Sequence, residues 1–440
     1  MKGIKRIFKK ALSLVTLAAV LFCAVGCTGS PMPVEPGADP TQSANKPAAI
    51  KAVNLMAGIG SKNDASPVVP TASSSVKAAD FAVRLFKACL EEGENALVSP
   101  LSVLAALSMT ANGAKGETLS QMEDVLGMSV DELNEFYYNY AAQLVNGEKY
   151  KLDLANSIWF TADDRFTVNE AFLQKNADYF GADVYKAPFD NGTRQDINSW
   201  VNEHTDGMIP DILGPDIDMS AAVMILVNAL AFDAEWQSVY HEDQVHKGEF
   251  TREDGSKRQV DFMYSEEYAY LHADNAEGFM KYYNDGRYAF AALLPNDGVK
   301  LSELVASLDG EKLMNILNGA ANESVQTSIP KFETEYSVQL NDKLSAMGMP
   351  NAFEQWSAEF EGLGTSTAGN IFIDRVLHKT FISVDERGTR AGAATAVVMA
   401  DEAMALITHT VLLDRPFLYM LIDCETNLPF FIGTLTDVGE

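Results

Sequence analysis

The pattern of hydrophobic and polar residues along the chain changes most abruptly between residues 381 and 399. Residues 381–384 (FISV) are typical of the end of a strand, and the charged segment 385–388 (DERG) interrupts it. The next run, TRAGAATAVV, carries only small or β-branched side chains apart from Arg390. Gly392 and the β-branched residues lower the helical propensity of this run. Two structures fit: a surface loop or poorly formed helix, or a segment that is an exposed loop in one state and a buried strand in another.

Written as a strand, the run separates into two faces, because successive side chains point to opposite sides of a sheet. One face carries Thr389, Ala391, Ala393 and Thr395, none of which is charged. Arg390 falls on the other face. A strand that enters a core needs such an uncharged face, so this pattern is compatible with the buried strand.

From residue 76 onward the chain alternates between helical and strand patterns. Phe81, Leu85 and Leu90 recur at helical spacing. Ser99 precedes Pro100 in the order that favours the start of a helix. Apolar residues alternate over residues 152–160, as on one face of a strand. These interleaved patterns, which show no internal repeat, predict a mixed α+β class.

The first 75 residues have a different composition. Lysines and an arginine within residues 2–10 precede an apolar segment over residues 11–25, which is short for a membrane span and typical of a signal peptide. It ends at Cys27 in a context that resembles a bacterial lipoprotein cleavage box, where the cysteine is lipidated; an ordinary secretory signal is the alternative. Residues 28–75 are rich in Pro, Ser, Ala, Gly and Thr and contain no aromatic residue. We therefore predict a signal peptide at 1–27, a flexible linker at 28–75 and a folded domain at 76–440.

Charge and motifs argue against several classes of function. The net charge of −28 disfavours nucleic acids, heparin-like polyanions and anionic membrane surfaces as partners. The G-x-S-x-G motif of hydrolases and the phosphate-binding P-loop are absent. His241 and His246 have the wrong spacing for the paired zinc ligands of a helix. No cofactor or metal site is predicted, and Cys89 and Cys424 are expected to be unpaired thiols.

Several stretches, in order along the chain, resemble the serpin family of serine protease inhibitors. They are NALVSPLSVLAALSMTANGAKGETLSQMEDVLG from residue 95, INSWVNEHTDGMIPDIL from 197, LVNALAFDAEWQSVY from 226, SIPKFETEYSVQLNDKLSAMGM from 328, VLHKTFISVDERGT from 376 and RPFLYMLIDCETNLPFFIGTLTDV from 415. The resemblance implies one domain with three β-sheets, about eight or nine helices and a long exposed reactive-centre loop.

The resemblance also implies a mechanism. A protease attacks the loop and forms an acyl-enzyme, and the cleaved loop then inserts into the central sheet as a new strand, which traps the protease. The serpin itself has no catalytic residue. The implied partners are serine proteases, and cysteine proteases are a further class. A non-inhibitory serpin that acts as a binding or chaperone module is the alternative.

Individual residues take roles from the same resemblance. The hinge from which the loop inserts matches Glu386, Gly388, Thr389, Ala391, Ala393 and Thr395. A polar cluster beneath the central sheet matches Ser99, Ser102, Asn228 and His378, and Trp236 matches a tryptophan at the point of loop entry. The small residues from Ala391 to Ala396 favour an inhibitory member, because a charge or proline at an inward-facing hinge position would slow insertion.

The cleaved bond is less closely defined. Counting along the loop from Glu386 places it at Glu402–Ala403, whereas a longer loop moves it to Met404–Ala405 or Ala405–Leu406. We favour the second group, because small and apolar specificity suits a broad protective inhibitor. We expect a monomer that is exported and anchored to the cell envelope or surface through a lipid on Cys27, with a released extracellular form as the alternative.

Overall fold

The computed structural model of this chain describes residues 50–144, 146–367, 369–389 and 407–439. These residues form nine α-helices and three β-sheets, which confirms the predicted α+β class and the expected number of sheets. No helix within the described ranges is long and apolar enough to cross a membrane.

The first sheet, called the central sheet below, has seven strands in the order β1-β5-β3-β6-β15-β14-β12. Strands β3 and β6 pair antiparallel over their whole length, and β6 and β14 pair in parallel at one end. In chain order the strands are β1 (Val53–Asn54), β3 (Tyr150–Thr161), β5 (Asp183–Ala187), β6 (Met224–Glu235), β12 (Phe332–Gln339), β14 (Arg375–Val384) and β15 (Gly388–Thr389).

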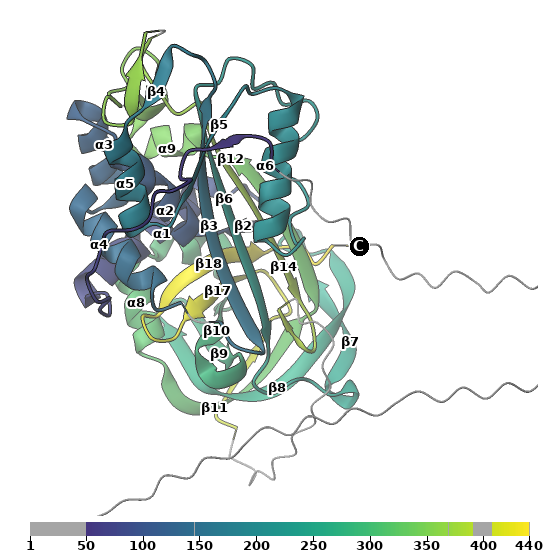
Figure 1. The fold of residues 1–440 in the computed structure, drawn as a ribbon. Coiled ribbons are helices and arrows are strands. Elements are labelled where there is room, and N and C mark those ends of the chain that lie inside the picture. The colour runs from purple at the N-terminus through teal and green to yellow at the C-terminus, as the bar shows by residue number, and fades with distance from the viewer. Residues whose placement is uncertain (1–49, 145, 368, 390–406, 440) are drawn as a thin grey trace, which may run out of the picture. The chain divides into compact units, whose positions relative to one another are not determined.

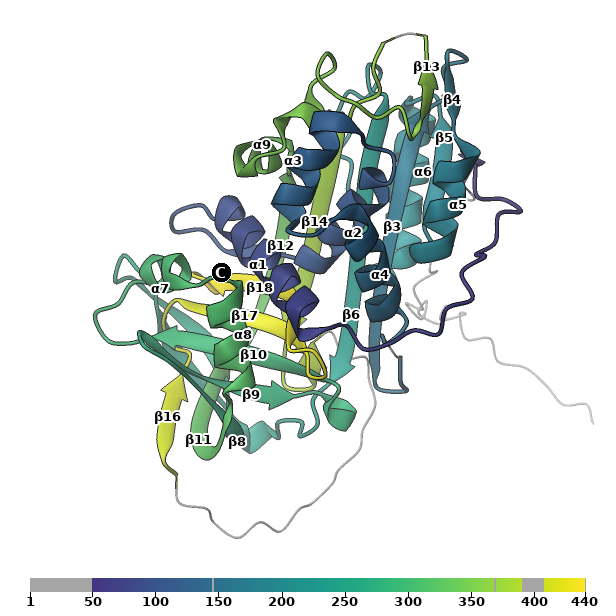
Figure 2. The same cartoon turned by 90° about the vertical axis from the view of Figure 1, so that its left-hand side faces the viewer.

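Helices cover both faces of the central sheet. Figures 1 and 2 show α6 (Asn191–His204) on one face and a group of helices on the other. That group contains α1 (Ala72–Cys89), α2 (Pro100–Ala111), α3 (Gly116–Leu126), α4 (Val130–Ala141), α5 (Glu170–Tyr179) and α9 (Asn341–Met347). The two apolar layers are separate clusters, so the sheet is buried between them.

The second sheet has nine strands, in the order β16-β11-β8-β9-β10-β17-β18-β2, with β7 paired to β8. Its strands are β2 (Ala96–Val98), β7 (Val245–Thr251), β8 (Lys257–Ala273), β9 (Ala276–Tyr282), β10 (Tyr288–Pro295), β11 (Ala321–Pro330), β16 (His409–Leu412), β17 (Phe417–Asp423) and β18 (Leu428–Leu435). Helices α7 (Leu301–Ser307) and α8 (Gly310–Asn318) flank it, and β4 (Phe166–Val168) pairs with β13 (Gly364–Ser366) in the small third sheet. Short 3₁₀ turns lie at Glu242–Gln244, Asn284–Gly286 and Pro350–Phe353.

Side-chain patterns explain where strands sit in these sheets. Every residue of β10 is buried, and its sequence YAFAALLP is apolar throughout, as expected for a strand covered on both faces. In the edge strand β12, buried Phe332 and Thr334 alternate with exposed Glu333 and Glu335. The period of two therefore marks a strand with one buried face.

The segment before the first long helix differs from the prediction. Residues 50–71 lie on the domain: Val53 and Asn54 pair with β5, and the backbone N–H groups of Lys51 and Ala52 donate to the Asp196 carboxylate at 3.0 and 2.7 Å. Helix α1 begins at Ala72 and not at residue 76. The predicted linker boundary is therefore too late, because a segment poor in aromatic residues is held by backbone hydrogen bonds to an existing sheet edge.

Candidate functional site

A tight turn at residues 385–388 returns the chain from the end of β14 into the central sheet. The Asp385 N–H donates to the Gly388 carbonyl at 3.0 Å, and the Asp385 carboxylate accepts from the Arg387 and Gly388 N–H groups at 2.8 and 3.2 Å. Strand β15 then pairs with both neighbours, with β6 through Gly388 and Thr389 and with β14 through Thr389.

Strands β6 and β14 are parted at one end only. Where β15 lies between them they do not pair directly, whereas Arg375–His378 of β14 pair with Ile225–Asn228 of β6 further along. The site is thus a seam between two strands that is open at the loop end and closed beyond it.

The two hinge residues of β15 fit tightly into this seam. A Cβ atom on Gly388 would lie 1.9 Å from the Ala234 carbonyl oxygen, so a side chain has no room there. Thr389 is 2 % exposed, and its hydroxyl lies 2.5 Å from the Tyr283 hydroxyl. A larger or charged residue at either position would have to part the strands further.

Trp236 and Tyr240 hold the turn by its carbonyl groups. The Trp236 indole N–H donates to the Asp385 carbonyl and its backbone N–H donates to the Arg387 carbonyl, both at 2.8 Å. The Tyr240 N–H donates to the Glu386 carbonyl at 2.9 Å. Three successive carbonyls at the root of the loop are therefore fixed, two of them by Trp236.

Glu386 is anchored by its side chain as well. Its carboxylate lies 2.5 Å from the Lys331 Nζ atom, and this contact holds the pKa of Glu386 below its usual value. Lys331 directly precedes the edge strand β12. Lys331, Tyr240 and Tyr283 were not among the predicted residues, since only the folded chain brings them to the turn.

The predicted polar cluster occupies the closed part of the seam. Asn228 of β6 is the register partner of His378 in β14 and of Asn156 in β3. The Ser99 N–H donates to His378 Nε2 at 3.0 Å, and Ser102, three residues further along the chain, is also buried. Helix α2 begins at Pro100 as predicted, but the Ser99 side chain makes no capping hydrogen bond.

Asn156 belongs to this cluster and was not predicted to do so. It is 7 % exposed and lies at a buried position of β3. The sequence does mark this residue, because every second residue from 152 to 160 is apolar except Asn156. The five residues of the cluster thus lie on three strands and at the start of α2: Asn156, Asn228 and His378 on β3, β6 and β14, and Ser99 and Ser102 at α2.

Burial gives His378 a pH dependence that can be measured. Its pKa is lowered to about 4 by burial, from 6.5. Between these values the unfolded state binds more protons than the folded state, so stability falls as the pH drops through this window. Replacing His378 by glutamine should remove this loss. From pH 7 to pH 4 the free energy of unfolding should fall by about 3 kcal/mol less than in the wild type, as measured by urea unfolding.

The exposed His272 provides the control for this prediction. His272→Gln removes an exposed histidine instead and controls for the substitution itself. A His378→Gln curve parallel to that of the wild type over pH 4 to 7 would contradict a neutral buried imidazole.

Part of the predicted site lies outside the described residues. This applies to Ala391, Ala393 and Thr395 of the hinge, to the candidate cleavage residues Glu402, Ala403, Met404, Ala405 and Leu406, and to Cys27. Cys89 and Cys424 are free thiols, as expected.

A family model described as Serpin (serine protease inhibitor) matches residues 76–438. The chain belongs to the serpin family. Members of this family are typically protease inhibitors and not enzymes. Serpin B10 of Homo sapiens is 30% identical over 389 residues, which cover 81% of this chain and 97% of that protein.

Solved structures place this serpin near a thermophilic relative. The native-state crystal structure of the thermophilic serpin tengpin is 45% identical, with a TM-score of 0.84, and covers 88% of this chain and 100% of its own. The latent-state structure of tengpin is 41% identical, with a TM-score of 0.73, and covers 85% and 100%. The fold described here is therefore more similar to the native-state structure.

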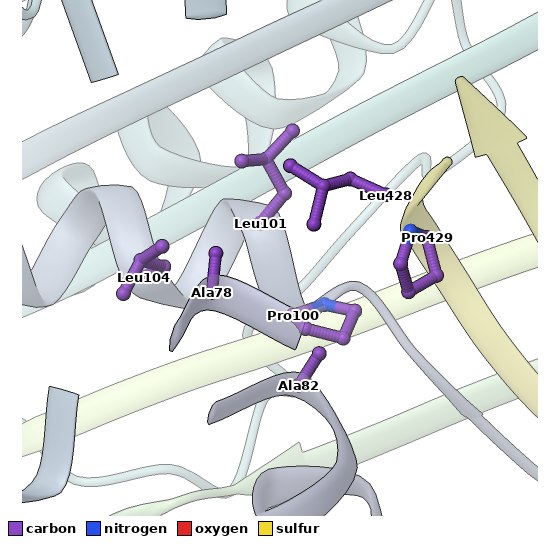
Figure 3. A pocket seen from close by; sticks show the side chains of 7 residues that line it. All are labelled: Ala78, Ala82, Pro100, Leu101, Leu104, Leu428 and Pro429. Atoms are coloured by element: carbon purple, nitrogen blue, oxygen red, sulfur yellow. The ribbon is translucent and has the colours of Figure 1, made fainter. Parts of the chain in front are cut away.

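A small cavity elsewhere in this serpin has no features of a ligand site. It has a volume of about 10 Å³, roughly the space of one water molecule, and lies between α1, α2 and the start of β18. Figure 3 shows that its lining is apolar: Ala78, Ala82, Pro100, Leu101, Leu104, Leu428 and Pro429. We interpret it as a packing gap.

Proposed function

We propose that this serpin inhibits serine-type endopeptidases by inserting its cleaved reactive-centre loop between β6 and β14. The observation that carries the proposal is the position of β15, which is bonded to both strands while the seam beyond it is closed. A strand that already has two neighbours needs only to be extended in order to become a full member of the sheet.

The register of β15 supports this extension. Gly388 faces Glu235 and Thr389 faces Ala234, so continuing the same antiparallel register would bring Met399 opposite Met224, the first residue of β6. On the other side, the pairing of Thr389 with Val384 would continue to the pairing of residue 398 with Arg375, the first residue of β14. The small-residue run therefore has the length of both neighbouring strands.

The same register gives the polar cluster a role in insertion. Thr395 would lie opposite Asn228 on one side and His378 on the other. In the closed seam these two residues are direct partners, and the Asn228 amide has no hydrogen-bond partner among the described residues. We infer that the entering strand replaces the direct pairing of Asn228 with His378, and that the unpartnered Asn228 amide is then available to bond the Thr395 hydroxyl.

The protease would supply the chemistry. Its nucleophilic serine attacks the loop carbonyl, the peptide bond breaks, and the new amino terminus leaves with the C-terminal piece, so that an ester links the loop to the enzyme. Insertion then competes with hydrolysis of this ester. Of the candidate bonds, we favour Met404–Ala405 or Ala405–Leu406 over Glu402–Ala403, which implies elastase-like or chymotrypsin-like targets.

Mixing the protein with elastase, chymotrypsin and a glutamyl endopeptidase tests the proposal. At least one of them should form a complex that survives SDS, and the mass of the released C-terminal fragment should identify the cleaved bond. A protease with a chemically blocked serine is the control and should form no complex. Cleavage by every protease without any complex would refute trapping and would favour a non-inhibitory binding or chaperone role.

Export and anchoring form a separate part of the proposal. The basic and apolar segments before Cys27 support secretion, and the cysteine context supports a lipid anchor at the cell envelope or surface.

A further inference from the structure

A lysine lies in the protein interior beneath the loop entry. Lys281, in β9, is 2 % exposed, and its Nζ atom lies 2.7 Å from the Glu267 carboxylate. The same atom lies 4.3 Å from the centre of the Tyr240 ring and 5.6 Å from the centre of the Trp236 ring. Burial lowers the pKa of Lys281, but the neighbouring Tyr240 and Glu267 groups outweigh it and raise the pKa above its ordinary value. Lys281 is therefore a charged group in contact with two aromatic faces.

The carboxylate partner is held by its own contacts. The Ser265 hydroxyl lies 2.7 Å from the Glu267 carboxylate and 3.2 Å from the Tyr240 hydroxyl. Lys281, Glu267, Ser265 and Tyr240 thus form a closed ring of polar contacts under the turn. A buried ion pair is a poor source of stability, because its desolvation offsets its attraction. Its place directly beneath Trp236 and Tyr240 points to positioning.

The two aromatic residues over Lys281 are those that hold the root of the loop. Trp236 and Tyr240 donate to the three carbonyls of residues 385–387. The Trp236 ring is also stacked on the Tyr283 ring, and the ring centres lie 4.4 Å apart. Movement of the Trp236 ring would pass through its indole N–H group to Asp385, and movement of Tyr240 would pass through its backbone N–H group to Glu386.

We propose that Lys281 is a positioning residue for loop insertion: its ammonium group, held by Glu267, fixes Tyr240 and Trp236, and these residues fix the starting point of the inserted strand. The inference rests on the proposed function. In that function, Lys281 would increase the rate of loop insertion relative to the rate of hydrolysis of the acyl-enzyme. Lys281 contacts residues that hold the turn at 385–387, and the candidate bonds lie more than ten residues further along the chain, so it should affect the outcome of the reaction and not the rate of attack.

A double variant, Lys281→Met with Glu267→Gln, removes both charges and leaves no unpaired ion. The ratio of loops hydrolysed to proteases trapped should rise at least about threefold, the size expected from the loss of a cation–π contact. The rate at which the loop is attacked should stay unchanged. The matched control is Arg252→Met with Asp437→Asn, which removes a partly buried ion pair of 2.7 Å between the residue after β7 and the C-terminal segment. The control should leave the stoichiometry unchanged, and an equal rise in both variants would show a general structural effect and overturn the proposal.

A second measurement needs no protease target. Acrylamide quenching of Trp236 fluorescence, isolated by subtracting a Trp236→Phe background, should increase at least about twofold in the Lys281→Met, Glu267→Gln variant and not in the control. If the wild type traps no protease, the proposed function fails, and quenching alone then decides whether Lys281 positions Trp236. Unchanged quenching in the folded variant overturns the inference.

Discussion

Replacing Thr389 by arginine is expected to convert this serpin from an inhibitor into a substrate. Thr389 is buried between β6 and β14, and its hydroxyl contacts the buried Tyr283 hydroxyl. A guanidinium group at this place would have to lose its hydration without a charged partner, at a cost of several kcal/mol. Each increase of about 1.4 kcal/mol in the barrier to insertion slows it tenfold. The number of inhibitor molecules consumed per protease inactivated should therefore rise at least about tenfold.

Two controls separate insertion from damage to the loop. Thr389→Ser keeps the hydroxyl beside Tyr283 and should still trap the protease. Arg387→Ala changes an exposed residue of the same turn and should behave like the wild type. The rate at which the loop is cleaved should be similar in all variants. Trapping by Thr389→Arg at the wild-type stoichiometry would contradict insertion through the seam.

The sequence predicts those parts of the seam whose residues are neighbours along the chain. The alternation of small residues from Thr389 onward and the charged turn before it are adjacent in the sequence, and the turn and the start of the strand fold as expected. The roles of Ser99, Asn228 and His378 came from family resemblance, and the structure brings Asn228 and His378 into register. The periodicity of the sequence does not predict this pairing, because Asn228 and His378 are far apart in the chain.

The supporting residues were not predictable for the same reason. Lys281 lies in the apolar stretch GFMKYY, where a single lysine suggests an exposed position on a strand, yet it is buried by an ion pair with β8. Residues 50–71 have the composition of a linker, yet they add a short strand to the edge of β5. In both places a contact with another strand determines the structure. Local secondary-structure propensity does not predict such a contact.

Cleavage of the reactive-centre loop is expected to raise the thermal stability of the protein greatly. Insertion of residues 390–399 in the register of β15 would place ten residues between β6 and β14, at the loss of the direct pairing of Arg375–His378 with Ile225–Asn228. The new strand would make on the order of 10–20 backbone hydrogen bonds, each worth roughly 0.5–1.5 kcal/mol net. The intact fold is then held by a kinetic barrier and not by equilibrium.

A gain on the order of 10 kcal/mol corresponds to a rise in Tm on the order of 10 °C for a domain of this size. Calorimetry of the intact protein and of protein nicked in the loop should show this difference. Nicked Thr389→Arg is the informative comparison, because its loop is cut but the buried charge opposes insertion. It should gain much less, which would assign the stability to the inserted strand and not to the cut. Equal Tm values for intact and nicked wild type would mean that the seam stays closed, and the proposed trapping mechanism would then have no driving force.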